Sequence, residues 1–334
     1  MELKLGKELL YLSKEDVARV NLSMAEIIDL VEYVYTEKGK GNTIMPCKMP
    51  MHPIPGSMTQ NLTAMPACIP GRKTSGVKFI GGYSTNYAKG LDYIYGLQIV
   101  TDIDTGIPVA VMDCNWVTAM RTSAVTGLGA RYLANKDSHV VCIIGCGAQG
   151  RNSVDALFCE LKEIKKIYAT DVVPASLDRF VKSVTEKYHV EVVPVTDLEA
   201  AIRDSDIVVS GVPSDNTPEQ KVIPKGWLKS NATVFPVDLG VTFYEDAISD
   251  EVFDKSYTDD HAQFLHFQED NFLVQLKKLP VEFGDMLTGK FPARESHDER
   301  IVSVPPGTGL ADLITAHAVY ERALKLGIGT VLPL

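Results

Sequence analysis

The stretch His139-Val-Val-Cys-Ile-Ile-Gly-Cys-Gly-Ala-Gln-Gly150 decides the fold class of this chain of 334 residues. A short apolar run ends in the pattern Gly145-x-Gly147-x-x-Gly150, and a helix-like segment follows. Glycine permits a tight turn and lets the backbone approach phosphates, while the N–H groups of a helix N-terminus attract an anion. The stretch therefore predicts a strand–turn–helix unit that holds the pyrophosphate of a dinucleotide.

A carboxylate follows where a dinucleotide site needs one. The next strand-like run, residues 166–170, ends at Asp171, and a ribose-binding acid is expected about 20 residues beyond the glycine pattern. A carboxylate accepts hydrogen bonds from ribose hydroxyls and repels a 2′-phosphate, and Val172-Val-Pro174 brings no arginine. We therefore predict NAD(H) rather than NADP(H). The alternative is an ordinary strand–turn–helix with a surface aspartate.

The composition restricts the classes of function. A net charge of −10 argues against nucleic acid and anionic membranes as partners, because both select clustered Lys and Arg. The N-terminal residues form no signal-like segment, and no apolar run is long enough to span a bilayer. The six cysteines and seven histidines lack metal-ligand spacing, so we expect no metal and no disulfide framework. These features predict a cytoplasmic protein.

The first third of the sequence predicts a small α+β domain. Ser23 and Glu26 form a capping box before an amphipathic run over residues 27–35. Residues 42–72 are rich in Pro and Met and predict extended chain and turns around short strands. Strand-like runs with a hairpin signal between the last two predict a mostly antiparallel sheet, at residues 75–83, 93–102 and 108–113.

Strands and helices alternate after a long helix over residues 115–134. Strands are expected at 140–144, 166–170, 191–194, 206–210, 233–237 and 300–304, with helices at 149–159, 175–186 and 197–203. This alternation predicts a parallel sheet with helices on both faces and a ligand at the carboxyl ends of its strands. The strand ends that face such a ligand are at Gly145, at Ser210-Gly-Val212 and at Val237-Asp-Leu239.

A final amphipathic helix is expected over residues 310–326, after the turn Pro305-Pro-Gly-Thr-Gly309. Two interpretations of this turn stay open. It is either the entry to the helix or a wall of the nicotinamide pocket.

Three cations in the first domain are candidates for binding an anion: Lys48, Lys78 and Arg121. Strand alternation turns Lys78 away from Val77 and Phe79, and Arg121 lies among apolar residues of the long helix. A buried cation needs an anionic partner. That partner is either a carboxylate of this chain or the carboxylate of a substrate, which Arg binds in bidentate fashion.

Asp238 ends the strand-like run that begins at Thr233. A carboxylate at this position exchanges protons with an amine or orients a water. Alternatively, it caps a helix or accepts hydrogen bonds from backbone amides.

In their order along the chain, these residues resemble the ornithine cyclodeaminase/μ-crystallin family. The resemblance covers nearly the whole chain. The telling segments are Gly76-Val-Lys-Phe79, Asp102-Ile-Asp-Thr-Gly-Ile-Pro108, Thr118-Ala-Met-Arg-Thr122, Ala130-Arg-Tyr-Leu-Ala134 and Ile144-Gly-Cys-Gly-Ala-Gln-Gly150. The Thr-Ala-x-Arg-Thr run ahead of the glycine turn is specific to this family, and generic Rossmann dehydrogenases lack it.

The resemblance implies roles for individual residues. Lys78 and Arg121, helped by Lys48, would bind a substrate α-carboxylate, and Met65 would line the pocket. Asp238 and Lys78 would be the catalytic groups. The residues expected to contact NAD are Thr122, Gly145, Gly147, Ala148, Gln149, Asp171, Ser210, Val212, Val237 and Leu239. The chain departs from the family pattern around Asp238, where Pro236-Val-Asp-Leu-Gly240 replaces a Gly-x-Asp-x-Pro-Gly-Lys-like run, and at Lys48, where the family usually has arginine.

The predicted fold is α/β, with a Rossmann-type NAD-binding domain over residues 122–312. An α+β substrate-binding and dimerisation domain takes residues 1–121 and 313–334, and the resemblance implies a homodimer. The expected function is that of an NAD-dependent ornithine cyclodeaminase-like enzyme. Such an enzyme removes the α-hydride of a small amino acid, closes a ring with loss of ammonia and returns the hydride. The alternatives are a ketimine reductase or alanine-type dehydrogenase, and a non-catalytic binding protein.

Overall fold

The computed structural model describes residues 1–54, 60–214 and 216–334, and its internal contacts divide the chain into two compact units. Unit 1 comprises Met1–Arg121 and Gly307–Leu334, and unit 2 comprises Thr122–Pro306. The first division follows Arg121. The return to unit 1 comes at Gly307 rather than at Leu313, because Thr308 caps helix α9 (Gly309–Leu326) and the whole helix belongs to unit 1.

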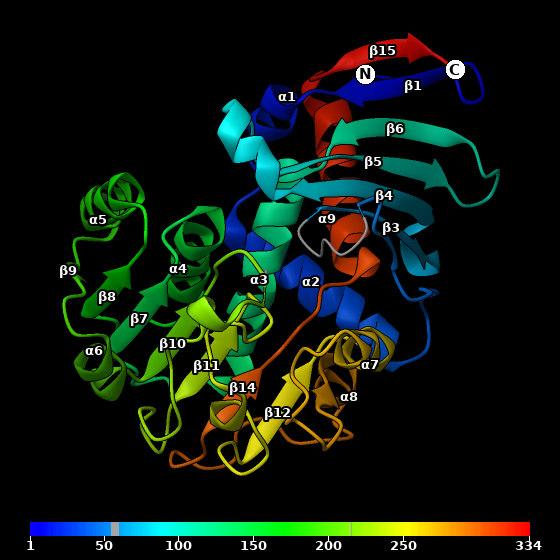
Figure 1. The fold of residues 1–334 in the computed structure, drawn as a ribbon. Coiled ribbons are helices and arrows are strands. Elements are labelled where there is room, and N and C mark those ends of the chain that lie inside the picture. The colour runs from blue at the N-terminus through cyan, green and yellow to red at the C-terminus, as the bar shows by residue number, and fades with distance from the viewer. Residues whose placement is uncertain (55–59, 215) are drawn as a thin grey trace. The chain divides into compact units, whose positions relative to one another are not determined.

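In the described residues of unit 1, strands form a seven-stranded sheet in the order β15-β1-β6-β5-β4-β3-β2 (Figure 1). The pairs are antiparallel except for β1 with β6, so the expectation of a mostly antiparallel sheet is confirmed. The strands are β1 (Glu8–Leu12), β2 (Met49–Met51), β3 (Gln60–Ile69), β4 (Thr74–Tyr83), β5 (Ile94–Asp102), β6 (Pro108–Asp113) and β15 (Thr330–Pro333).

Helices cover one face of this sheet. Helix α9 lies against β3, β4 and β5, and α2 (Met24–Gly39) lies against α9, while α1 (Lys14–Arg19) contacts β1 and β6. The capping box expected at the start of α2 is confirmed, with the Glu26 N–H donating to Ser23 Oγ. Along β4 the inward positions, among them Lys78 and Ile80, are buried, whereas Phe79 faces outward and is 45% exposed.

Unit 2 is a doubly wound sheet. In its described residues eight strands pair in the order β13-β12-β14-β11-β10-β7-β8-β9, and every pair is parallel (Figure 1). Alternate residues of β7 point to opposite faces: Val141 and Ile143 pack with α4 and α5, and Cys142 and Ile144 pack on the α6 side. The predicted α/β Rossmann-type fold is therefore confirmed.

The elements of unit 2 include the strands β7 (Val140–Ile144), β8 (Lys166–Thr170), β9 (Glu191–Pro194), β10 (Ile207–Ser210), β11 (Thr233–Pro236), β12 (Lys255–Thr258), β13 (Val281–Glu282) and β14 (Ile301–Ser303). The helices are α4 (Ala148–Glu160), α5 (Pro174–Tyr188), α6 (Leu198–Asp204), α7 (His261–Glu269) and α8 (Phe283–Leu287). Helix α3 (Asn115–Leu133) runs across the division between the units. Short 3₁₀ helices are η1 (Pro70–Arg72), η2 (Ser84–Lys89), η3 (Pro218–Gln220) and η4 (Glu245–Ala247).

Several elements differ from the sequence-based expectation. Within residues 42–72, β3 is one strand of ten residues rather than a set of short ones, and residues 55–59 lie outside the described residues. The single long strand was not expected because the sequence contains Pro66, and proline is rare inside sheets. It is tolerated because β2 pairs with β3 only as far as Ala64, which leaves Pro66 near an edge. Strands β1, β12, β13 and β15 were not predicted.

Candidate functional site

The three glycines of the turn after β7 differ in the space around them. Gly145 has a φ of +95°, and a Cβ there would lie 2.6 Å from the Gly211 carbonyl oxygen. A Cβ at Gly150 would lie 2.0 Å from the Gly145 carbonyl oxygen, so only glycine lets helix α4 pack this closely. A Cβ at Gly147 would meet nothing within 4 Å among the described atoms. The first and third glycines thus shape the turn, and the second borders open space.

That open space lies at the N-terminus of α4. Gly147 is the N-cap residue and supplies no side-chain hydrogen bond, so the first N–H groups of the helix lack a side-chain cap. Such an N-terminus favours an anion. Ala148 is exposed there, and Ser123 Oγ donates to Gln149 Oε1 at 3.3 Å. These residues fit the pyrophosphate of a dinucleotide.

Asp171 is tied to the same turn by backbone hydrogen bonds. The Cys146 N–H donates to its Oδ2 and the Val173 N–H donates to its Oδ1, each at 2.7 Å. A carboxylate oxygen accepts more than one hydrogen bond. Asp171 is therefore held in position while it keeps the capacity to accept hydrogen bonds from ribose hydroxyls.

The ends of β10 and β11 are joined through Asp238, which is 1% exposed. Ser210 Oγ donates to Asp238 Oδ1 at 2.9 Å, and the Gly240 N–H donates to the same oxygen at 3.1 Å. Among the described residues, Oδ2 has no hydrogen-bond partner. Burial raises the pKa of Asp238 to about 6, although the hydrogen bonds from Ser210 and Gly240 oppose the change. The group binds backbone amides, as one interpretation expected, and it also titrates near neutral pH.

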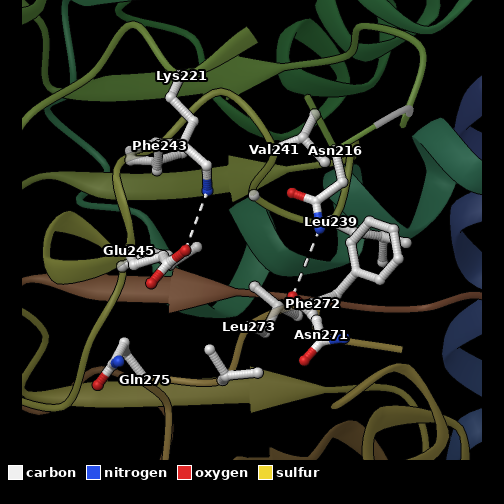
Figure 2. A pocket seen from close by; sticks show the side chains of 13 residues that line it. Asn216, Lys221, Leu239, Val241, Phe243, Glu245, Asn271, Phe272, Leu273 and Gln275 are labelled. Atoms are coloured by element: carbon white, nitrogen blue, oxygen red, sulfur yellow. Dashed lines mark hydrogen bonds and ion pairs between the residues drawn. The ribbon is translucent and has the colours of Figure 1, made fainter. Parts of the chain in front are cut away.

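Leu239 lines a small pocket in unit 2. Figure 2 shows this pocket, which Phe272 and Leu273 also line and whose volume is about 20 Å³. That volume holds about one water molecule and no part of a cofactor. Leu239 has a φ of +60°, which is unusual for a residue other than glycine. The expected contact between Leu239 and a cofactor stays a prediction, as do those of Thr122, Val212 and Val237, which are all half-buried.

In unit 1 two predicted site residues, Lys78 on β4 and Arg121 on α3, converge on one carboxylate, Asp312. Lys78 Nζ lies 2.7 Å from Asp312 Oδ2, and Arg121 Nε donates to Oδ1 at 2.8 Å. Lys78 is 1%, Arg121 7% and Asp312 0% exposed. The sequence left open whether these cations pair with a carboxylate of this chain. They do, and the single carboxylate of Asp312 pairs with both.

This arrangement shifts the pKa values of the buried groups. Burial alone would raise the pKa of Asp312, but Arg121 and Lys78 more than offset it and lower that pKa. Burial lowers the pKa of Lys78, which Asp312 opposes and Arg121 reinforces. Asp312 is thus an anion, and Lys78 gives up its proton more easily than an exposed lysine does.

The surroundings of Lys78 form a row across the inward face of the sheet. Met65 on β3 and Gln98 on β5 lie directly opposite Lys78 in the strand register, and both are buried. Gln98 Oε1 has no hydrogen-bond partner among the described residues. Lys48 lies half-buried just before β2. The structure thus places Met65 beside Lys78, and its contact with a substrate stays a prediction.

The turn at residues 305–309 is the entry to α9, because Thr308 Oγ accepts the Ala311 N–H. The backbone of this turn also lies close to the Arg121 guanidinium: a Cβ at Gly307 would lie 2.8 Å from Arg121 Nη1. Sequence reasoning missed Asp312, which stands in the first turn of this helix. The available signal was a lone acid among the apolar residues Leu310, Ala311 and Leu313.

Other features of the chain bear on the predicted site. Among the described residues, no group of three or more His, Cys, Asp or Glu side chains is arranged to hold a metal ion. The six cysteines, all within the described part of the chain, form no disulfide. In the same described part, no helix is both long and apolar enough to cross a membrane.

The chain is similar to curated proteins over almost its entire length. It is 29% identical to the nodulation efficiency protein NfeD of Rhizobium meliloti, covering 96% of this chain and 97% of that protein. The N-((2S)-2-amino-2-carboxyethyl)-L-glutamate dehydrogenase of Staphylococcus aureus is 27% identical, with 99% and 100% covered. The alanine dehydrogenase of Archaeoglobus fulgidus is 30% identical, with 97% and 98% covered.

Two solved structures share the fold of the whole chain. An archaeal alanine dehydrogenase dimer with bound NAD superposes with a TM-score of 0.83 at 25% identity, covering 97% of this chain and 99% of that one. The Δ(1)-pyrroline-2-carboxylate reductase of Thermococcus litoralis, in complex with NADH and L-proline, gives a TM-score of 0.82 at 26% identity, with 96% and 99% covered.

A model of the ornithine cyclodeaminase/mu-crystallin family matches residues 8–327. That range includes the glycine turn of unit 2 and the buried cations of unit 1. Because the match extends over nearly all of both units, the chain belongs to the ornithine cyclodeaminase/mu-crystallin family.

Proposed function

We propose that this protein is an NAD-dependent enzyme that acts at the Cα–N bond of a small amino acid, or on the corresponding imino acid. The observation that carries the proposal is the convergence of Lys78 and Arg121, both buried, on the single carboxylate of Asp312. Two cations and one acid give this trio a net charge of +1. A substrate α-carboxylate balances that charge and provides a fork for arginine.

The glycine turn supports NAD as the cofactor. The open space at Gly147, the N-terminus of α4 and the fixed carboxylate of Asp171 fit its pyrophosphate and its adenosine ribose. NAD held in this way supplies a hydride acceptor at Cα and later a hydride donor. Asp171 favours NAD over NADP because its negative charge repels a 2′-phosphate.

Lys78 and Asp238 are the proposed groups for moving protons. Both are buried, and burial moves the pKa of each toward neutrality, downward for Lys78 and upward, to about 6, for Asp238. Groups with pKa values near the working pH are effective acids and bases. In this proposal Lys78 orients the substrate carboxylate and exchanges a proton near Cα, and Asp238 takes up or releases a proton as the amine changes its charge.

Two forms of this chemistry are compatible with such a site. In the cyclodeaminase form, a side-chain amine attacks the oxidised Cα–N centre, ammonia leaves and the hydride returns, so no NADH accumulates. In the net redox form, an imino acid is reduced or an amino acid is oxidised, and NADH is consumed or formed. The relatives at 27% and 30% identity are both named dehydrogenases, which favours the net redox form.

The experiment that tests the proposal compares ammonia and NADH. Purified protein is mixed with NAD⁺ and L-ornithine, L-lysine, L-alanine or L-proline, and in reverse with NADH and cyclic ketimines or pyruvate with ammonium. Ammonia in large excess over NADH identifies a cyclodeaminase, and equal amounts identify a dehydrogenase. NADH consumption with a ketimine identifies a reductase. If NADH binds but no compound reacts, the protein is a binding protein and the proposal is wrong.

We also propose that two copies pair through unit 1. Residues directly opposite in antiparallel strands share a face of the sheet. Met49, Phe79 and Leu97 lie in one such row and are 55%, 45% and 47% exposed, and Met51 and Tyr95 lie in the next row. An exposed apolar sheet face of this kind indicates a protein interface. The likeness to an alanine dehydrogenase dimer supports a homodimer.

We propose a cytoplasmic location, because the six cysteines of the described residues form no disulfide. Cell fractionation tests this location, and recovery outside the cytoplasmic fraction would contradict it.

A further inference from the structure

We propose that Asp312 is a positioning residue for the substrate: it holds the Lys78 ammonium and the Arg121 guanidinium in the orientation that receives an α-carboxylate. This inference rests on the proposed function, in which those two cations bind the substrate. In that proposal Asp312 touches neither substrate nor cofactor. It acts only through Lys78 and Arg121.

The geometry of the carboxylate supports this role. Asp312 uses one oxygen for each cation, Oδ2 for Lys78 at 2.7 Å and Oδ1 for Arg121 at 2.8 Å. The three side chains come from a strand and two helices, so a single group on α9 fixes functional atoms from two other elements, β4 and α3. Without Asp312, two buried like charges would repel each other, because their interaction is poorly screened in the protein interior.

Asp312 is itself held firmly. It stands in the first turn of α9, where the helix dipole favours a negative charge. The N-cap residue Thr308 accepts the Ala311 N–H at 3.3 Å, and its hydroxyl lies 3.2 Å from the Tyr35 hydroxyl on α2. The carboxylate is therefore anchored by its helix cap and by the packing of α2 before any substrate binds.

The Arg121 guanidinium is confined on a second side by the turn that precedes α9. Gly307 has a φ of +91°, and a Cβ there would lie 2.8 Å from Nη1 and 3.3 Å from Nη2. The backbone of the turn therefore borders the Nη atoms, while Asp312 binds Nε. These two contacts fix the plane of the guanidinium, which is the property that bidentate binding of a carboxylate requires.

Asp312 also controls the charge of Lys78. The charged and titratable groups that affect Lys78 are Asp312, Arg121 and Cys114. Burial raises the pKa of Cys114 to about 12, so its thiol is neutral, and Arg121 stays cationic. Asp312 is thus the group that opposes the loss of the Lys78 proton. Removing its charge lowers the pKa of Lys78 further.

The experiment uses two substitutions and a matched control in the full-length protein. Asp312→Asn keeps the shape of the side chain and removes its charge, and Asp312→Glu restores the charge. Glu160→Gln removes the charge of another acid that binds an arginine, Arg131, at 2.8 Å in unit 2. Each variant is measured for the KM and kcat of the reacting amino acid or ketimine, for the Kd of NADH, and for the pH profile of kcat/KM.

We expect Asp312→Asn to raise KM by about tenfold or more, because a misoriented pair of cations loses a charge-assisted hydrogen bond. The basic limb of its pH profile moves to lower pH, and the Kd of NADH is unchanged. Asp312→Glu moves both properties back toward the wild type, and the control matches the wild type. A lower melting temperature with wild-type KM and an unchanged basic limb would assign Asp312 a purely structural role and overturn the inference. If Asp312→Asn does not fold, the Glu variant must still show a raised KM.

A second measurement separates this inference from the proposed function. The rate at which acetic anhydride acetylates Lys78 is followed against pH by peptide mass spectrometry, without substrate. We expect the midpoint of this curve to fall in Asp312→Asn and to stay unchanged in Glu160→Gln. If the wild-type protein turns over none of the amino or imino acids, the proposed function fails, and this midpoint alone shows whether Asp312 controls Lys78. An unchanged midpoint in Asp312→Asn overturns that control.

Discussion

Asp238 is the residue whose burial has the clearest consequence for stability. Its pKa is 3.8 in an ordinary environment and is raised to about 6 by burial. A carboxyl group with a raised pKa stabilises the folded state below the unfolded pKa, and this contribution is lost as pH rises through the folded pKa. The carboxyl is thus protonated at acid pH, and at neutral pH the fold carries a buried charge.

We predict that the stability of the wild type relative to Asp238→Asn falls between about pH 4 and about pH 6, and then stays constant. The fall is at most about 3 kcal/mol, since one pKa unit corresponds to about 1.4 kcal/mol. Urea unfolding of both proteins across this range measures it. A constant difference at all pH values would mean that Asp238 has an ordinary pKa in the folded protein.

The same substitution tests the catalytic role of Asp238. If the carboxyl group moves a proton in the reaction, Asp238→Asn lowers kcat by about 10² to 10⁴. It leaves the Kd of NADH unchanged, because the amide still accepts the hydrogen bonds of Ser210 and Gly240. The matched control is Glu160→Gln, which makes the same change of acid to amide elsewhere in unit 2. A wild-type kcat in Asp238→Asn would limit Asp238 to holding the ends of β10 and β11.

Asp171 is the residue that we propose sets the choice of cofactor. We predict that Asp171→Ser raises the affinity for NADPH relative to NADH by about tenfold or more, because the charge that repels a 2′-phosphate is gone. Fluorescence titration with both nucleotides measures the ratio. Asp178→Ser, on the exposed surface of α5, is the control. An unchanged ratio would remove Asp171 from ribose recognition.

At the scale of elements, two glycines of the β7–α4 turn have different expected roles. Gly150 is expected to serve packing and Gly147 is expected to serve cofactor binding. Gly150→Ala places a Cβ 2.0 Å from the Gly145 carbonyl oxygen, so α4 must move away from β7. We predict that it destabilises the protein by about 1–3 kcal/mol or more. Gly147→Ala places its Cβ in open space, so we predict a nearly unchanged melting temperature but weaker NADH binding. Thermal melts and NADH titrations distinguish the two, and equal effects of both substitutions would contradict this division.

Some parts of the fold could be predicted from the sequence, and others could not. The glycine turn and the inward direction of Lys78 follow from residues that are neighbours in the chain, and both were predicted. Asp312 was not predicted because it lies 191 residues from Arg121, and no local pattern identifies a partner at that distance. The partners of β1 are likewise distant: it pairs in parallel with β6 and antiparallel with β15, at the other end of the chain.

The candidate site could be predicted from the sequence to a similar extent. Its candidate cations and glycines belong to local motifs, so the sequence alone was enough to single them out, and their roles stay predictions. The hydrogen bonds from Ser210 and Gly240 to Asp238 depend on the order in which β10 and β11 lie in the sheet, so the burial of Asp238 was not predictable. The same holds for Leu239, which lines a small pocket and has a positive φ in the turn after β11.

At the scale of the whole molecule, the outward face of the unit 1 sheet makes the association of two copies testable. Phe79 and Leu97 lie opposite each other on β4 and β5, and each is nearly half exposed. We predict that Phe79→Glu converts a wild-type dimer to a monomer at micromolar concentration, because a charge buried in an apolar interface lacks a partner. Sedimentation velocity measures the change.

The matched control is Leu265→Glu on α7, which alters an apolar side chain of similar exposure, 48%, in unit 2. It should leave the dimer intact. NADH titration of both variants then shows whether unit 2 depends on the association. We expect unchanged affinity, because the glycine turn and Asp171 belong to unit 2, whereas Phe79 belongs to unit 1. A dimer that survives Phe79→Glu, or that is lost in Leu265→Glu, would place the contact between subunits on another surface.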